Sequence, residues 1–194
     1  MAAGAKRGTA PSARGEVRII GGAWRGRRLA FPANTGLRPT PDRVRETVFN
    51  WLLPALPGAT CLDLFAGSGA FGFEALSRGA ARAVLVDSHA ETVEALRANG
   101  ARLKAQLAEI MQVDALQWLR GPVEAFDIVF LDPPYASGLL APGIELLDSR
   151  AWVKPQGLIY LEAPQDAALP LPASWQLLRS KTAGQVGYHL ARKM

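Results

Sequence analysis

The chain has 194 residues, of which 49% are hydrophobic, so a single domain can bury a sizeable core. No apolar run approaches the ~18 residues of a membrane span. Residues 1–15 lack the apolar stretch of a secretory signal, and one cysteine with two histidines argues against a disulfide scaffold, a zinc cluster or an iron–sulfur site. These features predict a cytoplasmic protein that uses neither a membrane nor a metal.

The net charge of +5 is unevenly distributed along the chain. Residues 1–45 hold ten Lys or Arg and two acidic residues, whereas residues 46–194 hold twelve Lys or Arg and fifteen acidic residues. Clustered positive charge is typical of a protein that binds a polyanion. The candidate contacts are seven arginines of this region: Arg18, Arg25, Arg27, Arg28, Arg38, Arg43 and Arg45. Any one of these arginines could instead form an ion pair with Asp42 or Glu46, and for a single arginine this interpretation is as good as a polyanion contact.

The N-terminal region begins with residues 1–15, which are rich in Ala, Gly, Lys and Arg and predict a disordered basic arm. Short strands are expected at 17–20 and 27–31, because Gly21 and Gly22 permit a turn between them. The sequence therefore predicts a small β-hairpin after the arm.

A helix is expected next, with Thr40 as its N-cap and Pro41 at its first position. Its apolar stripe has helical spacing and comprises Val44, Val48, Trp51 and Leu52. Pro54 ends the helix. Hairpin and helix form a predicted extension, residues 16–54, of a catalytic core at 58–194, and the two make one domain at 16–194.

From residue 60 onward, strands alternate with helices. The expected strands are 61–65, 83–86, 109–113, 126–131 and 158–162, and the expected helices are 70–78, 90–107, 115–119 and 143–147. Residues 175–180 and 186–191 flank a turn at Ala183 and Gly184, which predicts a hairpin. The pattern indicates an α/β fold with a mostly parallel sheet, helices on both faces and an antiparallel edge.

A glycine loop follows the first strand of this alternating region, where α/β proteins bind ligands. The loop comprises Asp63, Leu64, Phe65, Ala66, Gly67, Ser68 and Gly69. No Lys-Ser or Lys-Thr follows it, and Asp63 would repel a pyrophosphate, so a cationic ligand with an ammonium group fits better. A structural turn without a ligand is the alternative interpretation.

Two further acids follow strands at the same edge. Asp87 comes 24 positions after Asp63, where an acid accepts hydrogen bonds from ribose hydroxyls, which indicates an adenosine-type ligand. Asp114 follows the third strand and could meet an adenine amino group. Both acids could instead be helix N-caps.

The most specific motif is Asp132-Pro133-Pro134-Tyr135, directly after an apolar strand. Two prolines interrupt the strand and hold Asp132 extended, so its carboxylate and neighbouring carbonyls can face a ligand. Such acceptors would bind both hydrogens of a base amino group and favour a directed nitrogen lone pair. Tyr135 could stack on the base.

These motifs resemble the amino-methyltransferase branch of the class I S-adenosylmethionine-dependent enzymes. Three N-terminal blocks narrow the resemblance to bacterial guanine-N2 methyltransferases of small-subunit (16S) rRNA: residues 18–27, 37–40 and 42–52. Residues 184–188 are similar too. The resemblance implies a Rossmann-like seven-stranded sheet with an antiparallel last strand, S-adenosyl-L-methionine as cofactor, and rRNA within an assembling subunit as substrate. Nothing in the sequence indicates a dimer, so a monomer is expected.

Other functions remain open at this point. Asp-Pro-Pro-Tyr is also compatible with adenine N6 or cytosine N4 of DNA or RNA, or with a protein glutamine amide, as methyl acceptor. A non-catalytic ribosome-assembly factor could retain this fold, although the intact motifs argue against it. A nicotinamide-dependent dehydrogenase would leave residues 132–135 unexplained.

Overall fold

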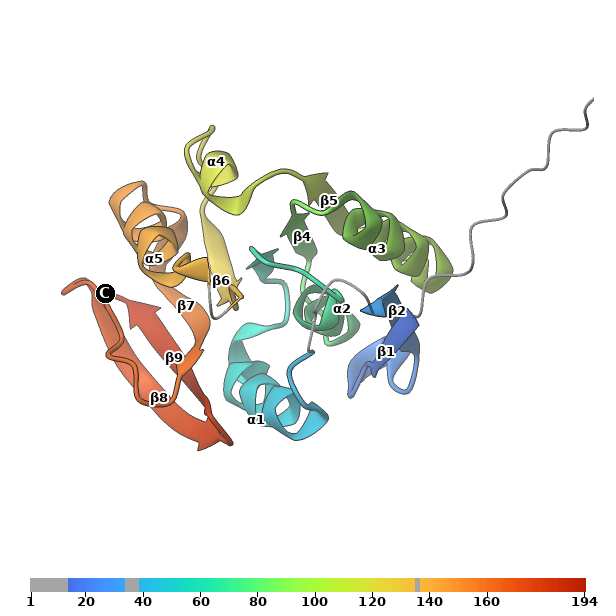
Figure 1. Cartoon of the computed structure of the whole chain (residues 1–194), viewed down its shortest axis with the longest axis horizontal. Coiled ribbons are helices and arrows are strands. Elements are labelled where there is room, and N and C mark those ends of the chain that lie inside the picture. The colour runs from blue at the N-terminus through green and yellow to red at the C-terminus, as the bar shows by residue number, and fades with distance from the viewer. Residues whose placement is uncertain (1–13, 34–38, 135–136) are drawn as a thin grey trace, which may run out of the picture.

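A seven-stranded sheet forms the centre of the protein in the computed structural model, which describes residues 14–33, 39–134 and 137–194 (Figure 1). Its strands lie in the order β5-β4-β3-β6-β7-β9-β8. They are β3 (Thr60–Asp63), β4 (Arg82–Asp87), β5 (Ala108–Gln112), β6 (Phe126–Leu131), β7 (Val153–Pro164), β8 (Trp175–Ala183) and β9 (Val186–Lys193). All neighbouring pairs from β5 to β7 are parallel.

The last strand, β9, is antiparallel to both of its neighbours, β7 and β8. It lies between them, so β8 is the edge strand on this side of the sheet and β5 the edge strand on the other. The predicted α/β class and the antiparallel last strand of a Rossmann-like sheet are therefore confirmed.

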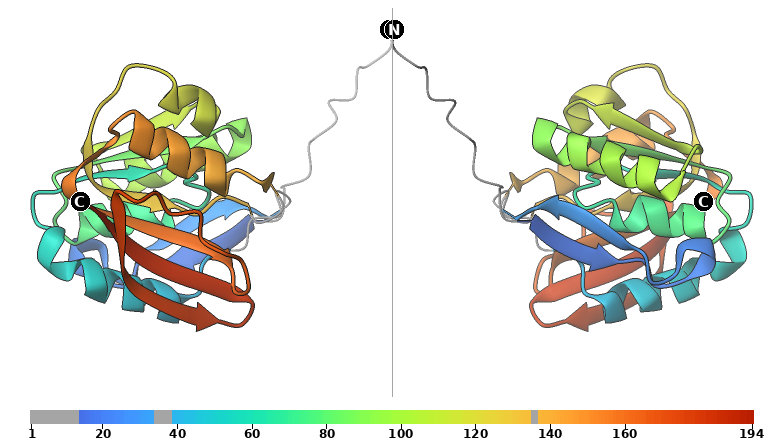
Figure 2. Two further views of the ribbon diagram at one scale, coloured as in Figure 1. Left: turned by 90° about the vertical axis from the view of Figure 1, so that its left-hand side faces the viewer. Right: turned by 90° about the vertical axis from the view of Figure 1, so that its right-hand side faces the viewer.

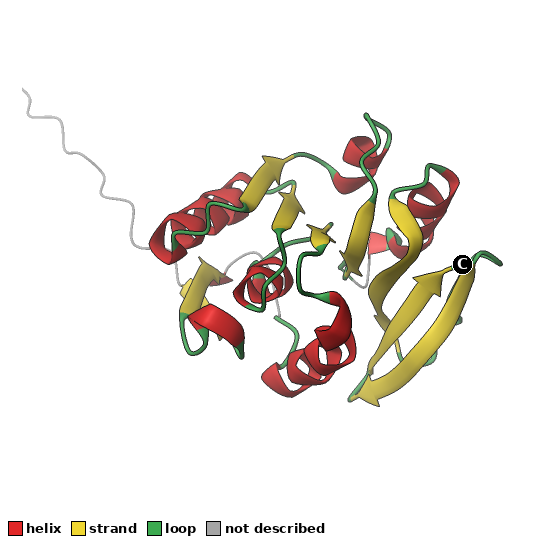
Figure 3. Cartoon of the chain, turned by 180° about the vertical axis from the view of Figure 1, so that it is seen from behind, coloured by secondary structure: helices red, strands yellow, loops and turns green. Residues whose placement is uncertain are grey.

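Helices cover both faces of the sheet (Figures 1 and 3). They are α1 (Asp42–Leu52), α2 (Ala70–Ser77), α3 (Ala90–Leu103), α4 (Ala115–Leu119) and α5 (Leu140–Ser149). Because strand side chains alternate between faces, Cys61 and Phe130 pack under α1 to α3, while Leu62 and Val129 pack under α4 and α5. Burial of these two apolar layers fixes the positions of the loops at the strand ends.

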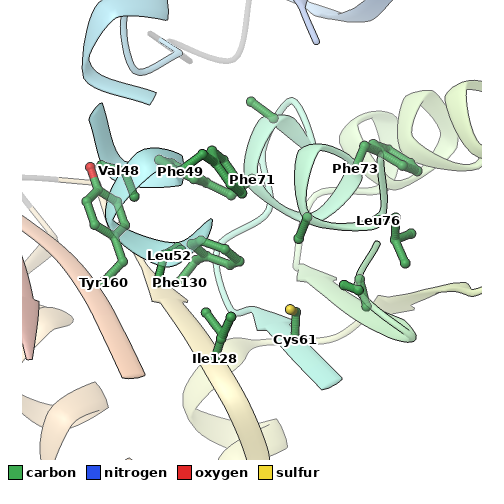
Figure 4. Close-up of a cluster of buried hydrophobic side chains, with 14 of the residues drawn as sticks. Val48, Phe49, Leu52, Cys61, Phe71, Phe73, Leu76, Ile128, Phe130 and Tyr160 are labelled. Atoms are coloured by element: carbon green, nitrogen blue, oxygen red, sulfur yellow. The ribbon is translucent and has the colours of Figure 1, made fainter. Parts of the chain in front are cut away.

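Aromatic rings fill the first of these layers (Figure 4). The ring centroid of Phe71 lies 5.1 Å from that of Phe130 and 4.9 Å from that of Tyr160. Phe49 of α1 stacks on Phe71 at 6.1 Å. These contacts fix α1 and α2 against β6, which leads into the most specific motif, and against β7 beside it.

The N-terminal hairpin consists of β1 (Arg14–Arg18) and β2 (Arg28–Pro32), which pair antiparallel and lie against α2 and α3 (Figure 2). The first strand begins at Arg14, so Arg14 and Gly15 belong to it and not to the arm, and it ends before residues 19 and 20. Residues 1–13 lie outside the described part of the chain.

The helix start at Thr40 was predicted wrongly. Helix α1 begins at Asp42, Pro41 occupies the N-cap position, and no side chain caps the helix. The Thr40 hydroxyl contacts two carboxyl groups instead. Similarly, the helix expected over 90–107 ends at Leu103, because Lys104 adopts a left-handed conformation with φ 57°.

None of the helices in the described ranges is long and apolar enough to cross a bilayer.

Candidate active site

The carboxyl ends of the central strands bring several acidic side chains together. Asp63 ends β3, Asp87 ends β4, Asp132 follows β6, and Glu162 lies near the end of β7. Because these strands are parallel neighbours, their ends meet at one edge of the sheet. The motifs found in the sequence therefore lie together at this edge of the sheet.

The glycine loop turns tightly from β3 into α2. Gly67 and Gly69 have φ values of 49° and 76°, which favour glycine. A Cβ on Gly69 would also lie 2.6 Å from the Phe73 ring and 2.7 Å from Leu96. These contacts leave no space for a side chain at Gly69, so the loop packs tightly against α2 and α3. Within the loop, Ala66 and Ser68 are buried and Phe65 is half-buried.

Asp63 is buried beneath this loop and accepts a hydrogen bond from the Gly72 backbone N–H at 2.9 Å. Burial, together with the negative charge of Asp87, raises the pKa of Asp63 to about 7 against the lowering effect of that hydrogen bond. A positive charge entering the site would favour the ionised form of Asp63. This carboxyl group fits a ligand with a cationic end, as predicted from the sequence.

Asp87 connects the loop to the start of α3. Its Oδ2 accepts from the Gly67 N–H at 3.0 Å, and its Oδ1 accepts from the His89 N–H at 2.9 Å. The side chain is 11% exposed, and its Oδ1 lies 3.4 Å from His89 Nδ1. The N-cap interpretation of Asp87 is wrong, because His89 occupies the N-cap position of α3 and no side chain caps this helix. The ribose interpretation stays a prediction.

Asp114 is the exposed N-cap of α4, and its Oδ1 accepts from the Gln117 N–H at 2.8 Å. The capping interpretation of Asp114 is confirmed. A contact with adenine stays a prediction.

The Asp-Pro-Pro motif leaves the sheet at the end of β6. Pro133 is buried and Pro134 is exposed. The Pro134 carbonyl accepts hydrogen bonds from the Ser137 N–H at 2.9 Å and from the Ser137 hydroxyl at 2.5 Å, so it is turned into the local loop. The carbonyls that precede the two prolines are the candidates for contact with a base amino group. Tyr135 lies outside the described residues, and its stacking role stays a prediction.

Asp132 itself has a neighbour that the sequence did not indicate. The Thr40 hydroxyl lies 3.3 Å from Asp132 Oδ2 and 2.8 Å from Oε1 of the buried Glu162. The Tyr160 hydroxyl donates to the same Glu162 oxygen at 2.5 Å. Asp132 keeps part of its surface exposed, yet the surrounding protein and the charges of Glu162 and Asp63 raise its pKa well above the usual range.

A groove of about 520 Å³ opens beside this cluster. The N-terminal hairpin contributes Arg18, Arg28 and Phe31 to its walls, and the segment before α1 contributes Pro39 and Thr40. Thr40 both lines the groove and contacts Asp132, so this one residue lies between the groove and the Asp132 carboxyl group.

Arg45 was predicted wrongly as a contact to a polyanion. Its side chain is completely buried, with Nε donating to the Thr40 carbonyl at 3.2 Å and Nη2 donating to the Arg18 carbonyl at 2.8 Å. It also pairs with Asp42 at 2.6 Å and faces the buried Glu74 at 3.8 Å. Arg45 therefore joins the extension to the core.

The other predicted arginines are distributed over the extension. Arg18 pairs with Asp42 at 2.9 Å, and Arg28 pairs with Glu16 at 2.8 Å, with the arginine side chains 62% and 70% exposed. Arg25, Arg27 and Arg43 are exposed or half-exposed, and Arg38 lies outside the described residues. All of these except Arg45 remain predictions as polyanion contacts.

The basic turn at residues 24–28 lies far from the glycine loop. The Trp24 N–H donates to the Ser77 hydroxyl at 2.9 Å, and Ser77 ends α2, whose first turn follows the loop. Eight helical residues span ~12 Å. Any contact of this turn with a large ligand is therefore remote from Asp132.

Comparisons with known proteins give a consistent result. A family model described as "Conserved hypothetical protein 95" matches residues 17–192. The "Ribosomal RNA small subunit methyltransferase D" of Escherichia coli K12 is 49% identical over 183 residues, covering 94% of this chain and 92% of that protein. The Haemophilus influenzae protein of the same name is 46% identical over 184 residues, covering 93% and 95%. The solved structure of the putative methyltransferase yhhF from Escherichia coli superposes with a TM-score of 0.85 at 47% identity, covering 92% of this chain and 98% of that one.

Proposed function

Because this chain belongs to the ribosomal RNA small subunit methyltransferase D family, we propose that it transfers a methyl group from S-adenosyl-L-methionine to N2 of a guanine in small-subunit rRNA. The observation that carries the proposal is the Asp132 carboxyl group at the end of β6, in the same sheet edge as the glycine loop. The relatives are named as enzymes of small-subunit rRNA, and the resemblance of residues 18–27, 37–40 and 42–52 supports guanine N2.

The cofactor site consists of the glycine loop and the acids around it. Asp87 faces the position of the ribose hydroxyls, and Asp63 provides negative charge beneath the loop. The close backbone approach that Gly67 and Gly69 permit leaves room for the ligand. When bound, S-adenosyl-L-methionine supplies a methyl group on a positively charged sulfur, whose leaving group is neutral.

The acceptor site is formed by residues of β6 and the segment before α1. Asp132 accepts one N–H of the guanine amino group, and a carbonyl of the Asp-Pro-Pro segment accepts the other, which orients the nitrogen lone pair. Pro133 fixes this geometry by holding Asp132 extended. The groove lined by Thr40, Phe31 and Arg18 supports entry of the base from the side of the extension.

The RNA reaches the site along the basic extension. Arg18, Arg25, Arg27, Arg28 and Arg43 provide exposed positive charge, and Arg38, which lies outside the described residues, is a further candidate contact. We propose further that the natural substrate is the small subunit during its assembly. The active form of the protein in this proposal is a cytoplasmic monomer.

The cofactor assignment predicts the effect of replacing Asp87. Asp87→Ala removes acceptors for ribose hydroxyls and releases the Gly67 N–H. Lost hydrogen bonds to a charged acceptor cost roughly 1.5–3 kcal/mol, so affinity for S-adenosyl-L-methionine should fall about tenfold to more than a hundredfold. Isothermal titration calorimetry measures this directly.

Asp127→Ala provides the matched control. Asp127 also accepts a backbone N–H, that of Thr60 at 2.8 Å, but it lies at the start of β6 on the opposite edge of the sheet. The affinity of Asp127→Ala for the cofactor should stay within a few-fold of that of the wild type. An equal loss of affinity in both variants would contradict the ribose assignment.

The substrate assignment predicts a specific change in cells that lack the protein. One N2-methylguanine should disappear from small-subunit rRNA, and reintroducing the wild-type chain should restore it. Mass spectrometry of nucleosides from purified subunits measures this change. Loss of a methyladenine or methylcytosine instead would favour another methyl acceptor, and unchanged methylation of RNA, DNA and protein would favour a non-catalytic assembly factor.

A further inference from the structure

The hydroxyl group of Thr40 connects two carboxyl groups in the acceptor site. Its Oγ1 lies 2.8 Å from Glu162 Oε1 and 3.3 Å from Asp132 Oδ2. Glu162 Oε1 also accepts the hydroxyl hydrogen of Tyr160 at 2.5 Å. Thr40 and Glu162 belong to neither the glycine loop nor the Asp-Pro-Pro-Tyr motif, and their role needs a separate explanation.

Counting hydrogens limits the protonation state of this cluster. A threonine hydroxyl carries one hydrogen, which it can donate to Glu162 or to Asp132. If Thr40 donates to the nearer Glu162, its contact with Asp132 is a hydrogen bond only when Asp132 carries a proton. If Thr40 donates to Asp132, the same argument puts the proton on Glu162. Both contacts of Thr40 can therefore be hydrogen bonds at once only when the two carboxyl groups hold one proton between them.

The surroundings favour Asp132 as the site of this proton. The groups around Asp132 are Glu162 of β7, Asp63 of β3, and Thr40 in the segment before α1. Tyr160 of β7 donates to Glu162, and the Arg45 guanidinium donates to the Thr40 carbonyl. Burial and the negative charges of Glu162 and Asp63 raise the pKa of Asp132 well above its usual range. The shorter Thr40–Glu162 contact agrees with Thr40 donating its hydrogen to Glu162.

We propose that Glu162 and Thr40 are positioning residues that keep Asp132 protonated in the ligand-free site, and that Asp132 releases its proton when a cationic methyl donor binds. In this step the O–H bond of Asp132 breaks, its electron pair stays on the carboxylate oxygen, and the proton passes to the buffer. Asp132 then becomes an acceptor for the guanine amino group only when a positive charge occupies the site. The inference rests on the proposed function.

Proton release can be measured without methyl transfer. Calorimetric titrations with S-adenosyl-L-methionine, in buffers that differ in ionisation enthalpy, give the number of protons released per ligand bound. The demethylated product, S-adenosylhomocysteine, is the matched ligand because it keeps the ammonium and adenosine groups and lacks the sulfonium charge. Both ligands carry the ammonium group that is proposed to interact with Asp63, so comparing them isolates the effect of the sulfonium charge, and the Glu162 variant assigns that effect to the Asp132–Glu162 pair.

We expect S-adenosyl-L-methionine to release up to about one proton more than S-adenosylhomocysteine near neutral pH. Glu162→Gln keeps the side-chain shape and removes the negative charge beside Asp132, which should lower the pKa of Asp132 and make this difference smaller than in the wild type. Glu124→Gln is the matched control, because Glu124 is exposed and pairs with Arg82 away from the site. It should release as many protons as the wild type.

Equal proton release by the two ligands in the wild-type protein would overturn the inference, whether or not Glu162→Gln folds. A wild-type difference that persists undiminished in Glu162→Gln would overturn the role of Glu162. Failure of the wild type to bind either ligand would overturn the proposed function and the inference together, whereas tight binding without a difference in proton release would overturn the inference alone.

Discussion

Replacing Asp132 with alanine is expected to reduce methyl transfer to small-subunit rRNA by about a hundredfold to ten-thousandfold, the range typical of a lost proton-accepting or charge-stabilising group. Asp132 is the carboxyl group that faces the acceptor nitrogen in the proposed function. Within the described residues its side chain makes one long contact, the 3.3 Å one with the Thr40 hydroxyl, so the fold should tolerate the change. Affinity for S-adenosyl-L-methionine should stay within a few-fold.

Single-turnover rates at saturating cofactor measure this prediction. Asp132→Asn is the sharper variant, because it keeps the shape and one acceptor oxygen but loses the charge. Asp127→Ala, near the opposite end of β6, serves again as the control and should transfer methyl groups at close to the wild-type rate. A rate near that of the wild type in Asp132→Ala would contradict the assigned role.

The second large effect concerns stability. Glu74 is fully buried on α2, and its carboxylate accepts from the backbone N–H groups of Ile20 and Gly21, both at 2.7 Å, and from Arg78 Nε at 2.7 Å. It also faces the buried Arg45 at 3.8 Å. Glu74→Ala leaves two amide donors and a buried cation without this acceptor. We expect the free energy of unfolding to fall by about 3–5 kcal/mol.

Urea denaturation gives this difference, and Glu109→Ala is the matched control. Glu109 also binds an arginine, Arg82, at 2.5 Å, but its side chain is 51% exposed. An exposed ion pair of this kind contributes less than about 1 kcal/mol. Similar losses in the two variants would show that the Glu74 network does not fix the extension to the core.

Local sequence patterns were sufficient to predict the elements of the core. Apolar runs and alternating periodicity located β6 and α4 at the residues where the structure has them. The carboxyl end of each strand then located Asp63, Asp87 and Asp132 on one edge. The same reasoning applied to β7 would have found Glu162, since this acid also lies near the carboxyl end of a predicted strand.

Long-range contacts were beyond such patterns. Thr40 before Pro41 has the local sequence of an N-cap, but its hydroxyl contacts carboxyl groups 92 and 122 residues away. Arg45 lies in a basic segment that is typical of RNA contacts, yet its side chain is buried because of how α1 packs beside α2. Both errors arose because tertiary packing decided between two interpretations that are equally good locally.

The position of β9 between β7 and β8 has a consequence for folding during synthesis. The ribosome makes β8 before β9, but β8 has no partner in the sheet until β9 has paired with β7. Meanwhile the free edge of β7, whose residues 158–163 are buried in the finished sheet, is open to strands of other nascent chains. At a translation rate of ~5–20 residues per second, the interval between completing β7 and completing β9 lasts one to several seconds. A chaperone that covers strand edges during this interval would raise the yield of folded protein.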